Sequence, residues 1–298
     1  MSQSKSTLPA FAKLAAAVVH APSLFQSLPK GQIQQQRTLN YQAGELQFQF
    51  VGPLLGALEL RVLQGLAGLA GPQNHELIVG AKGDPAQEDQ EPEVERITIS
   101  TSYNELARVI GYRANSGSSN SVIRDALETL CSMSVFVGLA DAPLSENRAV
   151  GTILNQQLDP KDGPSIVVEM CLVLTAAILG GRGQYLRVSL DEVRSLKTDP
   201  ARLLHHRLHW VNQGCTRDVK ISTMMNYVWP NSTESPSTLR TRRQVVRRAL
   251  NELMGLGWTV FKKAGDLYSI GRPAVSRTAR MPYHRHSPAI LQTRIAGV

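Results

Sequence analysis

Residues 238–256 constrain the fold more than any other part of the chain. Their apolar side chains recur every three or four positions, which predicts a helix that buries one face in a core. On a helical wheel this face centres on Val246 and is completed by Leu239, Ala249, Leu250 and Leu253. The segment carries one acidic residue, Glu252, so pairing with carboxylates along the helix cannot account for its arginines.

The opposite face of this predicted helix carries the side chains that DNA-reading helices use. Arginine matches the acceptors of guanine in the major groove, and glutamine or asparagine matches adenine. We therefore expect a recognition helix, with a merely solvated basic face as the alternative. The candidate DNA-binding residues on it are Arg240, Arg243, Gln244, Arg247, Arg248 and Asn251.

Position along the helix separates these candidates further. Such helices read bases mainly with their N-terminal half, which favours Arg240 and Gln244 as base contacts. Arg247 and Arg248 lie further on, where both bases and flanking phosphates are in reach. Arg242 lies near the apolar face, and the sequence leaves open whether a phosphate or a carboxylate pairs with it.

The elements around this helix follow the order of a winged helix. A short helix is predicted at 221–228, and two strands, 258–261 and 267–270, are joined by a turn with Gly265. Lys262 and Lys263 lie at this hairpin, or wing, where contact with the DNA backbone is expected.

The first half of the chain repeats this order. A strand at 97–100 leads into helices at 102–110 and 119–133, and strands follow at 135–137 and 149–157. The second of these helices offers Asn120 and Arg124, but its charge is nearly neutral, so it predicts weaker DNA binding or a protein contact.

The predicted fold class is therefore α+β, with two tandem winged-helix domains. We expect a loosely structured arm at 1–50, domains at 51–180 and 181–273, and a basic tail at 274–298. Within these parts we also expect a strand at 45–51, a helix at 54–69, an exposed acidic loop at 82–95 and a long helix at 191–211, interrupted near Pro200.

Charge is distributed unevenly between the two halves. Residues 187–298 carry 19 basic and 7 acidic side chains, a net charge of +12, whereas residues 1–186 have a net charge of −4. Most of the basic residues in the second half are arginines, which suit bidentate contacts with phosphate and guanine. This excess indicates a polyanionic partner and favours double-stranded DNA over a membrane surface.

Signals for other classes of protein are missing from the sequence. It has neither a phosphate-binding P-loop nor a dinucleotide-binding glycine motif, and its three cysteines lack metal-ligand spacing. His205 and His209 have a spacing compatible with zinc, but no HExxH glutamate accompanies them. We expect a cytoplasmic protein without enzymatic activity, cofactor, metal or membrane span.

Several segments together resemble the RepC replication initiators of IncQ-type plasmids. The likeness covers roughly residues 50–273, and the combination of its motifs is fairly specific. The segments are LRVLQGLAGLAG at 60–71, YNELARVIG at 103–111, VSLDEVRSLKTDPARLLHHRLHW at 188–210, YVWP at 227–230, STLRTRRQVVRRALNELMGLGWT at 237–259 and YSIGRP at 268–273.

This resemblance implies a function that the residue patterns alone do not supply. It implies binding to direct repeats, or iterons, at a plasmid origin, opening of adjacent A+T-rich DNA and recruitment of a plasmid-encoded helicase. Self-association stays open. The alternative is a winged-helix transcriptional regulator, and an enzyme acting on nucleic acid is a weaker third candidate.

The uneven charge makes a first testable prediction, which concerns salt. Binding of the chain to duplex DNA should weaken steeply with salt, because each neutralised phosphate releases condensed counterions. The measurement is the slope of log K against log salt concentration in a titration with labelled duplex. A slope near zero would contradict the electrostatic argument.

Overall fold

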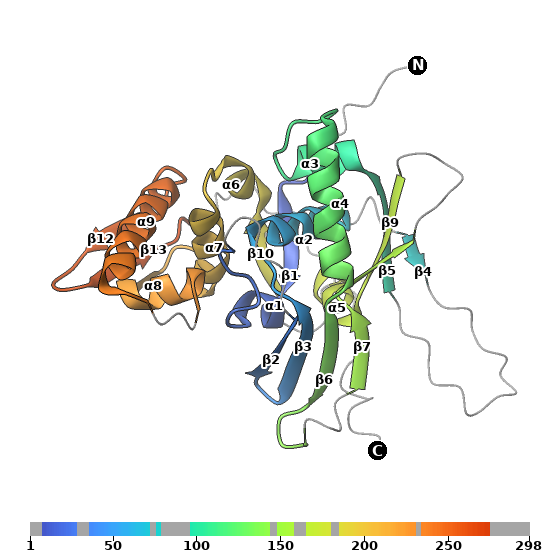
Figure 1. Cartoon of the computed structure of the whole chain (residues 1–298), viewed down its shortest axis with the longest axis horizontal. Coiled ribbons are helices and arrows are strands. Elements are labelled where there is room, and N and C mark those ends of the chain that lie inside the picture. Colours follow the sequence, from blue (N-terminus) through green and yellow to red (C-terminus); the bar gives the residue numbers. More distant parts are fainter. Residues whose placement is uncertain are drawn as a thin grey trace, which may run out of the picture.

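A computed structural model describes residues 8–28, 36–71, 76–78, 96–143, 148–157, 165–179, 185–230 and 234–274 of the chain. The elements that follow α6 gather at one end of the molecule, and those of the first half form the larger part (Figure 1). The expected acidic loop at 82–95 and the tail beyond residue 274 lie outside the described residues.

The expected loose arm is wrong for the described N-terminal residues. Strand β1 (Phe11–Ala15) pairs antiparallel with β10 (Tyr185–Ser189), and α1 (Ala16–His20) follows it. Leu14 and Val19 are fully buried. The alanine-rich segment has weak local preferences, so a strand more than 160 residues away decides its structure. β10 lies beyond the expected domain boundary at 180/181.

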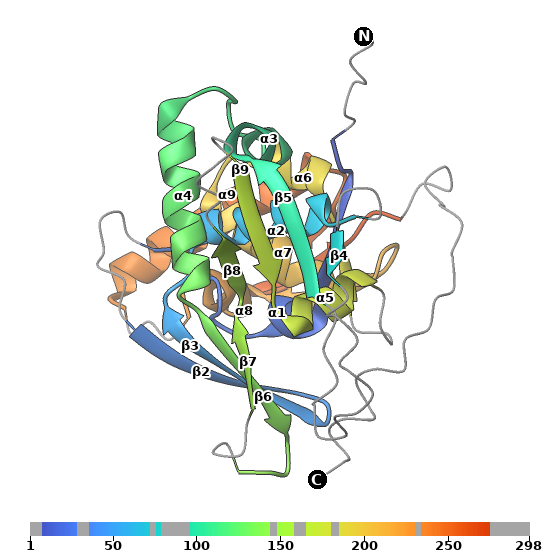
Figure 2. The same cartoon turned by 90° about the vertical axis from the view of Figure 1, so that its right-hand side faces the viewer.

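Two four-stranded sheets organise the first half. One has the order β2-β3-β6-β7, from β2 (Gln36–Ala43), β3 (Leu46–Pro53), β6 (Ser134–Leu139) and β7 (Arg148–Thr152). The other has the order β4-β5-β9-β8, from β4 (Glu76–Ile78), β5 (Arg96–Ser102), β9 (Ser165–Met170) and β8 (Leu154–Gln157) (Figure 2). The single strand expected at 149–157 is thus divided between the two sheets at Ile153.

Helices pack against one another and against the second of these sheets. α2 (Ala57–Leu69) is buried over nearly its whole length, and α3 (Tyr103–Val109) and α4 (Gly117–Cys131) occupy the two helical segments predicted after it. The Ser102 hydroxyl caps α3 by accepting a hydrogen bond from the Glu105 amide at 3.1 Å. α5 (Leu172–Leu179) contacts β1 and β5.

In the second half, the helices gather around α7 (Asp199–Arg207). α6 (Leu190–Ser195) precedes it and a short 3₁₀ helix (Leu208–Trp210) follows it. The expected long helix at 191–211 is interrupted at 196–198, because Leu196 is extended and Pro200 lies in the first turn of α7, where the missing amide costs nothing.

The last elements are α8 (Ile221–Val228), α9 (Pro236–Met254) and a three-stranded sheet. The sheet has the order β11-β13-β12, from β11 (Thr216–Lys220), β12 (Thr259–Lys262) and β13 (Leu267–Gly271). β11 was not predicted, since only Val219 in it is buried and it shows no alternation.

Buried polar contacts tie α6 to α7 and to the start of the C-terminal hairpin. One oxygen of the Glu192 carboxylate accepts hydrogen bonds from His205 Nε2 at 2.7 Å and from the Trp258 indole at 3.1 Å. His209 Nδ1 donates to the His205 carbonyl at 2.6 Å. These histidines therefore have structural partners on α6 and α7.

Two other contacts join the halves. The Arg194 guanidinium donates to the Val109 carbonyl, at the end of α3, at 3.1 Å. Gly111 has a φ of +76° and lies so close to Arg194 that an added Cβ would approach the Arg194 backbone to 3.2 Å. A side chain at position 111 would disturb this joint.

The buried histidines predict how stability depends on pH. Burial lowers the pKa of His206 and His209 well below their ordinary value, with smaller effects from Arg207 on the former and from His205 on the latter. Below pH ~6.5 the unfolded chain therefore binds more protons than the folded chain, so the free energy of unfolding falls as pH falls. Melting followed by circular dichroism should give a constant Tm between about pH 7 and 8 and a decline from about pH 6.5 to 5. A Tm that stays constant down to pH 5 would refute it.

Candidate nucleic-acid interface

α9 buries the face that its sequence pattern predicts. Ser235 caps the helix by accepting a hydrogen bond from the Thr238 amide at 3.3 Å, and Pro236 occupies the first turn. The apolar stripe packs against α7 and α8. Its fully buried members are Val246, Ala249, Leu250 and Leu253.

The predicted DNA-reading face of α9 is exposed along its length. All six candidate side chains lie in exposed positions: Arg240, Arg243, Gln244, Arg247, Arg248 and Asn251. The Glu252 carboxylate is turned away from them, because it accepts from the Lys197 amide at 2.8 Å and from the Thr198 hydroxyl at 2.6 Å, at the start of α7. The positive charge of this face is therefore not neutralised by the acidic residue of the helix.

Arg242 pairs with a carboxylate, which answers the question that the sequence left open. Its guanidinium lies 2.8 Å from Glu234 and 4.8 Å from the centre of the Trp229 ring. This arginine links Glu234, just before α9, to Trp229 at the end of α8, and it is separate from the six exposed candidates.

The hairpin places its two lysines on opposite faces. Lys262 pairs with Tyr268 across the strands, on the face that carries buried Val219. Lys263 follows on the other face, where its ammonium lies 2.7 Å from Asp218. That lysine holds the pKa of the Asp218 carboxyl below its usual range. Among the described residues, Lys262 makes no ion pair, so it is the better placed of the two to meet an external anion.

The candidates of the first half lie apart from this face. Figure 1 shows α4 and α9 well separated, and the contacts run from α4 through α2 and α7 to α9. Arg124 is exposed, with its guanidinium 5.5 Å from the Tyr103 ring. Asn120 is half-buried, and its buried Oδ1 has no partner among the described residues. The structure therefore does not join these two residues to the α9 set.

Sequence reasoning did not foresee what Tyr268 contributes. Its hydroxyl accepts a hydrogen bond from Arg247 Nε at 3.2 Å, which links α9 to the hairpin. The sequence offered one signal for this role, the alternation of the two strands. With the register known, alternation places Tyr268 on the same face as Lys262.

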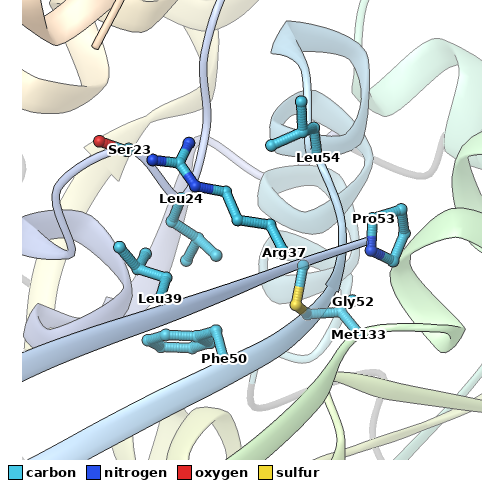
Figure 3. A pocket seen from close by; sticks show the side chains of 9 residues that line it. All are labelled: Ser23, Leu24, Arg37, Leu39, Phe50, Gly52, Pro53, Leu54 and Met133. Atoms are coloured by element: carbon cyan, nitrogen blue, oxygen red, sulfur yellow. The ribbon is translucent and has the colours of Figure 1, made fainter. Parts of the chain in front are cut away.

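A pocket lies on the first half, beside β2 and β3 (Figure 3). Arg37 is the one ionisable side chain among its lining residues, and Leu39, Phe50 and Met133 form much of its apolar wall. Among the described residues, no group of three histidine, cysteine or acidic side chains is placed to hold a metal ion. No helix in the described ranges has both the length and the apolar content needed to span a bilayer.

Comparison with known proteins gives one match to a family model. The model described as Replication protein C (RepC) matches residues 10–274. No curated protein matches the chain in sequence.

The solved structures with a similar fold include two of domains 2 and 3 of RctB. One is 11% identical, with a TM-score of 0.49, and the similarity covers 87% of this chain and 99% of that one. The other is 10% identical, with a TM-score of 0.48, and covers 86% and 95% respectively.

Proposed function

The chain belongs to the Replication protein C (RepC) family of replication initiators, and we propose that it binds directly repeated DNA sequences, or iterons, at a plasmid origin. The observation that carries this proposal is the exposed face of α9, where arginines alternate with Gln244 and Asn251. Those side chains match the donors and acceptors of bases in the major groove.

We infer that the C-terminal unit is a winged helix, with α9 as its recognition helix and β12–β13 as its wing. The order α7, β11, α8, α9, β12, β13 supports this interpretation, as does the packing of α7, α8 and α9 on one another. The base contacts then come chiefly from Arg240 and Gln244 in the N-terminal half of α9. Arg243, Arg248 and Asn251 contribute further contacts along the same face.

A second winged helix in the first half is proposed on the same grounds. The order α2, β5, α3, α4, β6, β7 repeats that of the C-terminal unit, apart from the interposed β4. The sheets differ, because β11 pairs with β13 whereas β5 pairs with β9 rather than with β7. In this unit α4, with Asn120 and Arg124, makes the weaker contact with DNA.

In the proposed initiation of replication the protein acts in the cytoplasm as a binding protein rather than as an enzyme. Binding to the repeats promotes opening of a neighbouring A+T-rich stretch, and a plasmid-encoded helicase is recruited there. Support for these steps comes from membership of the family and from the resemblance of the sequence motifs.

Footprinting on the plasmid that carries the gene tests this function. We expect protection of several direct repeats of about two helical turns each, beside an A+T-rich segment. A transcriptional regulator would instead protect one inverted repeat over a promoter, since a symmetric dimer requires a pseudo-palindrome. That second pattern, or the absence of any protected site, would overturn the initiator proposal.

Replacing a base-reading residue should change sequence preference. Arg240→Ala should weaken binding to the repeat by about 1–3 kcal/mol and leave binding to a scrambled duplex less affected, because a bidentate contact with guanine is lost. Competition binding measures the ratio of the two affinities. Arg108→Ala, which removes an exposed arginine from α3, is the charge-matched control. An equal loss of ratio in both variants would remove α9 from the role of reader.

A further inference from the structure

A hydrogen bond fixes one arginine of α9 against the hairpin. Tyr268 is 5% exposed, and its hydroxyl accepts from Arg247 Nε at 3.2 Å. This contact uses the inner nitrogen of the guanidinium. Among the described residues, the two terminal nitrogens of Arg247 have no hydrogen-bond partner, and the side chain is exposed. The hydroxyl of a buried tyrosine therefore holds the arginine in place, and the two terminal nitrogens of its guanidinium remain available as donors.

A second contact shows that the hairpin runs alongside the helix. Arg243 Nη2 lies 3.9 Å from Asp266, one turn earlier on α9 and two residues earlier on the hairpin. Four residues of helix rise about 6 Å and two residues of extended chain span about 6.6 Å, so the two contacts are spaced alike. The two contacts therefore hold α9 and the hairpin in a fixed orientation relative to each other, with an angle between their exposed edges.

Lys262 adds a second positive charge in this angle. It is the cross-strand partner of Tyr268, which places its Cβ on the same face at a separation of about 5 Å. The nearby carboxylates have other partners. Asp218 holds Lys263 on the opposite face, Glu252 accepts from residues 197 and 198 just before α7, and Asp266 faces Arg243. Among the described residues, neither Arg247 nor Lys262 pairs with a carboxylate, so both charges are available to an anion that enters the angle.

We propose that Arg247, Lys262 and Tyr268 form a binding site for a backbone phosphate of DNA, in the angle between α9 and the hairpin. This inference rests on the proposed function and deepens it. When α9 lies in the major groove and the hairpin lies beside it, the backbone of one strand passes between them. The terminal nitrogens of Arg247 suit bidentate contact with phosphate oxygens, and Lys262 acts as a point charge.

In this arrangement Tyr268 is a positioning residue. It orients Arg247 before DNA arrives, so less side-chain freedom is lost on binding. A phosphate contact carries no sequence information, so the site should strengthen binding to repeat and scrambled duplexes alike. This expectation separates Arg247 from Arg240, whose loss should change sequence preference.

A double-mutant cycle in the full chain tests the site. Arg247→Ala should weaken binding to both duplexes by roughly tenfold and reduce the salt slope by about one. Tyr268→Phe keeps the buried ring but removes the acceptor, and should weaken both by a few-fold. Tyr268→Phe added to Arg247→Ala should cause no further loss, because the tyrosine acts through the arginine. Circular dichroism melts establish that each variant is folded.

The two lysines provide a matched pair for the same assay. Lys262→Ala should weaken binding to both duplexes more than Lys263→Ala does, because the Lys263 ammonium pairs with Asp218 on the opposite face. Additive losses in the double mutant, a lowered preference for the repeat in Arg247→Ala, or equal effects of the two lysine variants would each overturn the site.

The scrambled duplex separates failure of this site from failure of the proposed function. If the wild-type chain binds both duplexes equally, the iteron proposal fails. The double-mutant cycle, measured by binding to the scrambled duplex, still decides whether the phosphate site exists. If the wild-type chain binds neither duplex, both proposals are overturned. If it prefers the repeat and Tyr268→Phe behaves as wild type, only the phosphate site is lost.

Discussion

Burial of the apolar stripe of α9 determines where every charged group of that helix points. Val246 and Leu250 are held against α7 and α8, so the helix cannot rotate without exposing them to water. The arginines on the far side are consequently fixed in direction, although their own side chains are exposed. The hairpin is placed by the same core, since Ile270 and Trp258 are buried beside the stripe. Everything proposed for this surface depends on that packing.

The two halves of the chain are joined by specific polar contacts as well as by apolar packing. Arg194 reaches the end of α3, and the Ser27 amide donates to the Val228 carbonyl at 2.8 Å. Contacts of this kind are directional, so they favour one orientation of the two parts. In the proposed function, this fixes the direction of α9 relative to α4.

Local periodicity explains what could be predicted from the sequence, and long-range pairing explains what could not. The apolar spacing of residues 238–256 predicted α9 and its exposed face, because a helix is specified by residues three and four apart. β1 and β11 were missed, since each is a short strand whose partner lies elsewhere in the chain. Lys262 and Lys263 looked equivalent in sequence, and only the strand register separates them. The partner of Arg247 likewise depends on where β13 lies beside α9.

The pairing of β1 with β10 has a consequence for how the chain is made. A ribosome that has synthesised β1 has not yet produced its partner strand β10, which ends at Ser189. Until then Leu14 and Val19 lack much of the core that covers them in the finished protein. Contacts so distant in sequence form late and slow the search for the native state. β1 therefore stays unpaired until nearly two thirds of the polypeptide has been translated, and the first half cannot complete its fold before then.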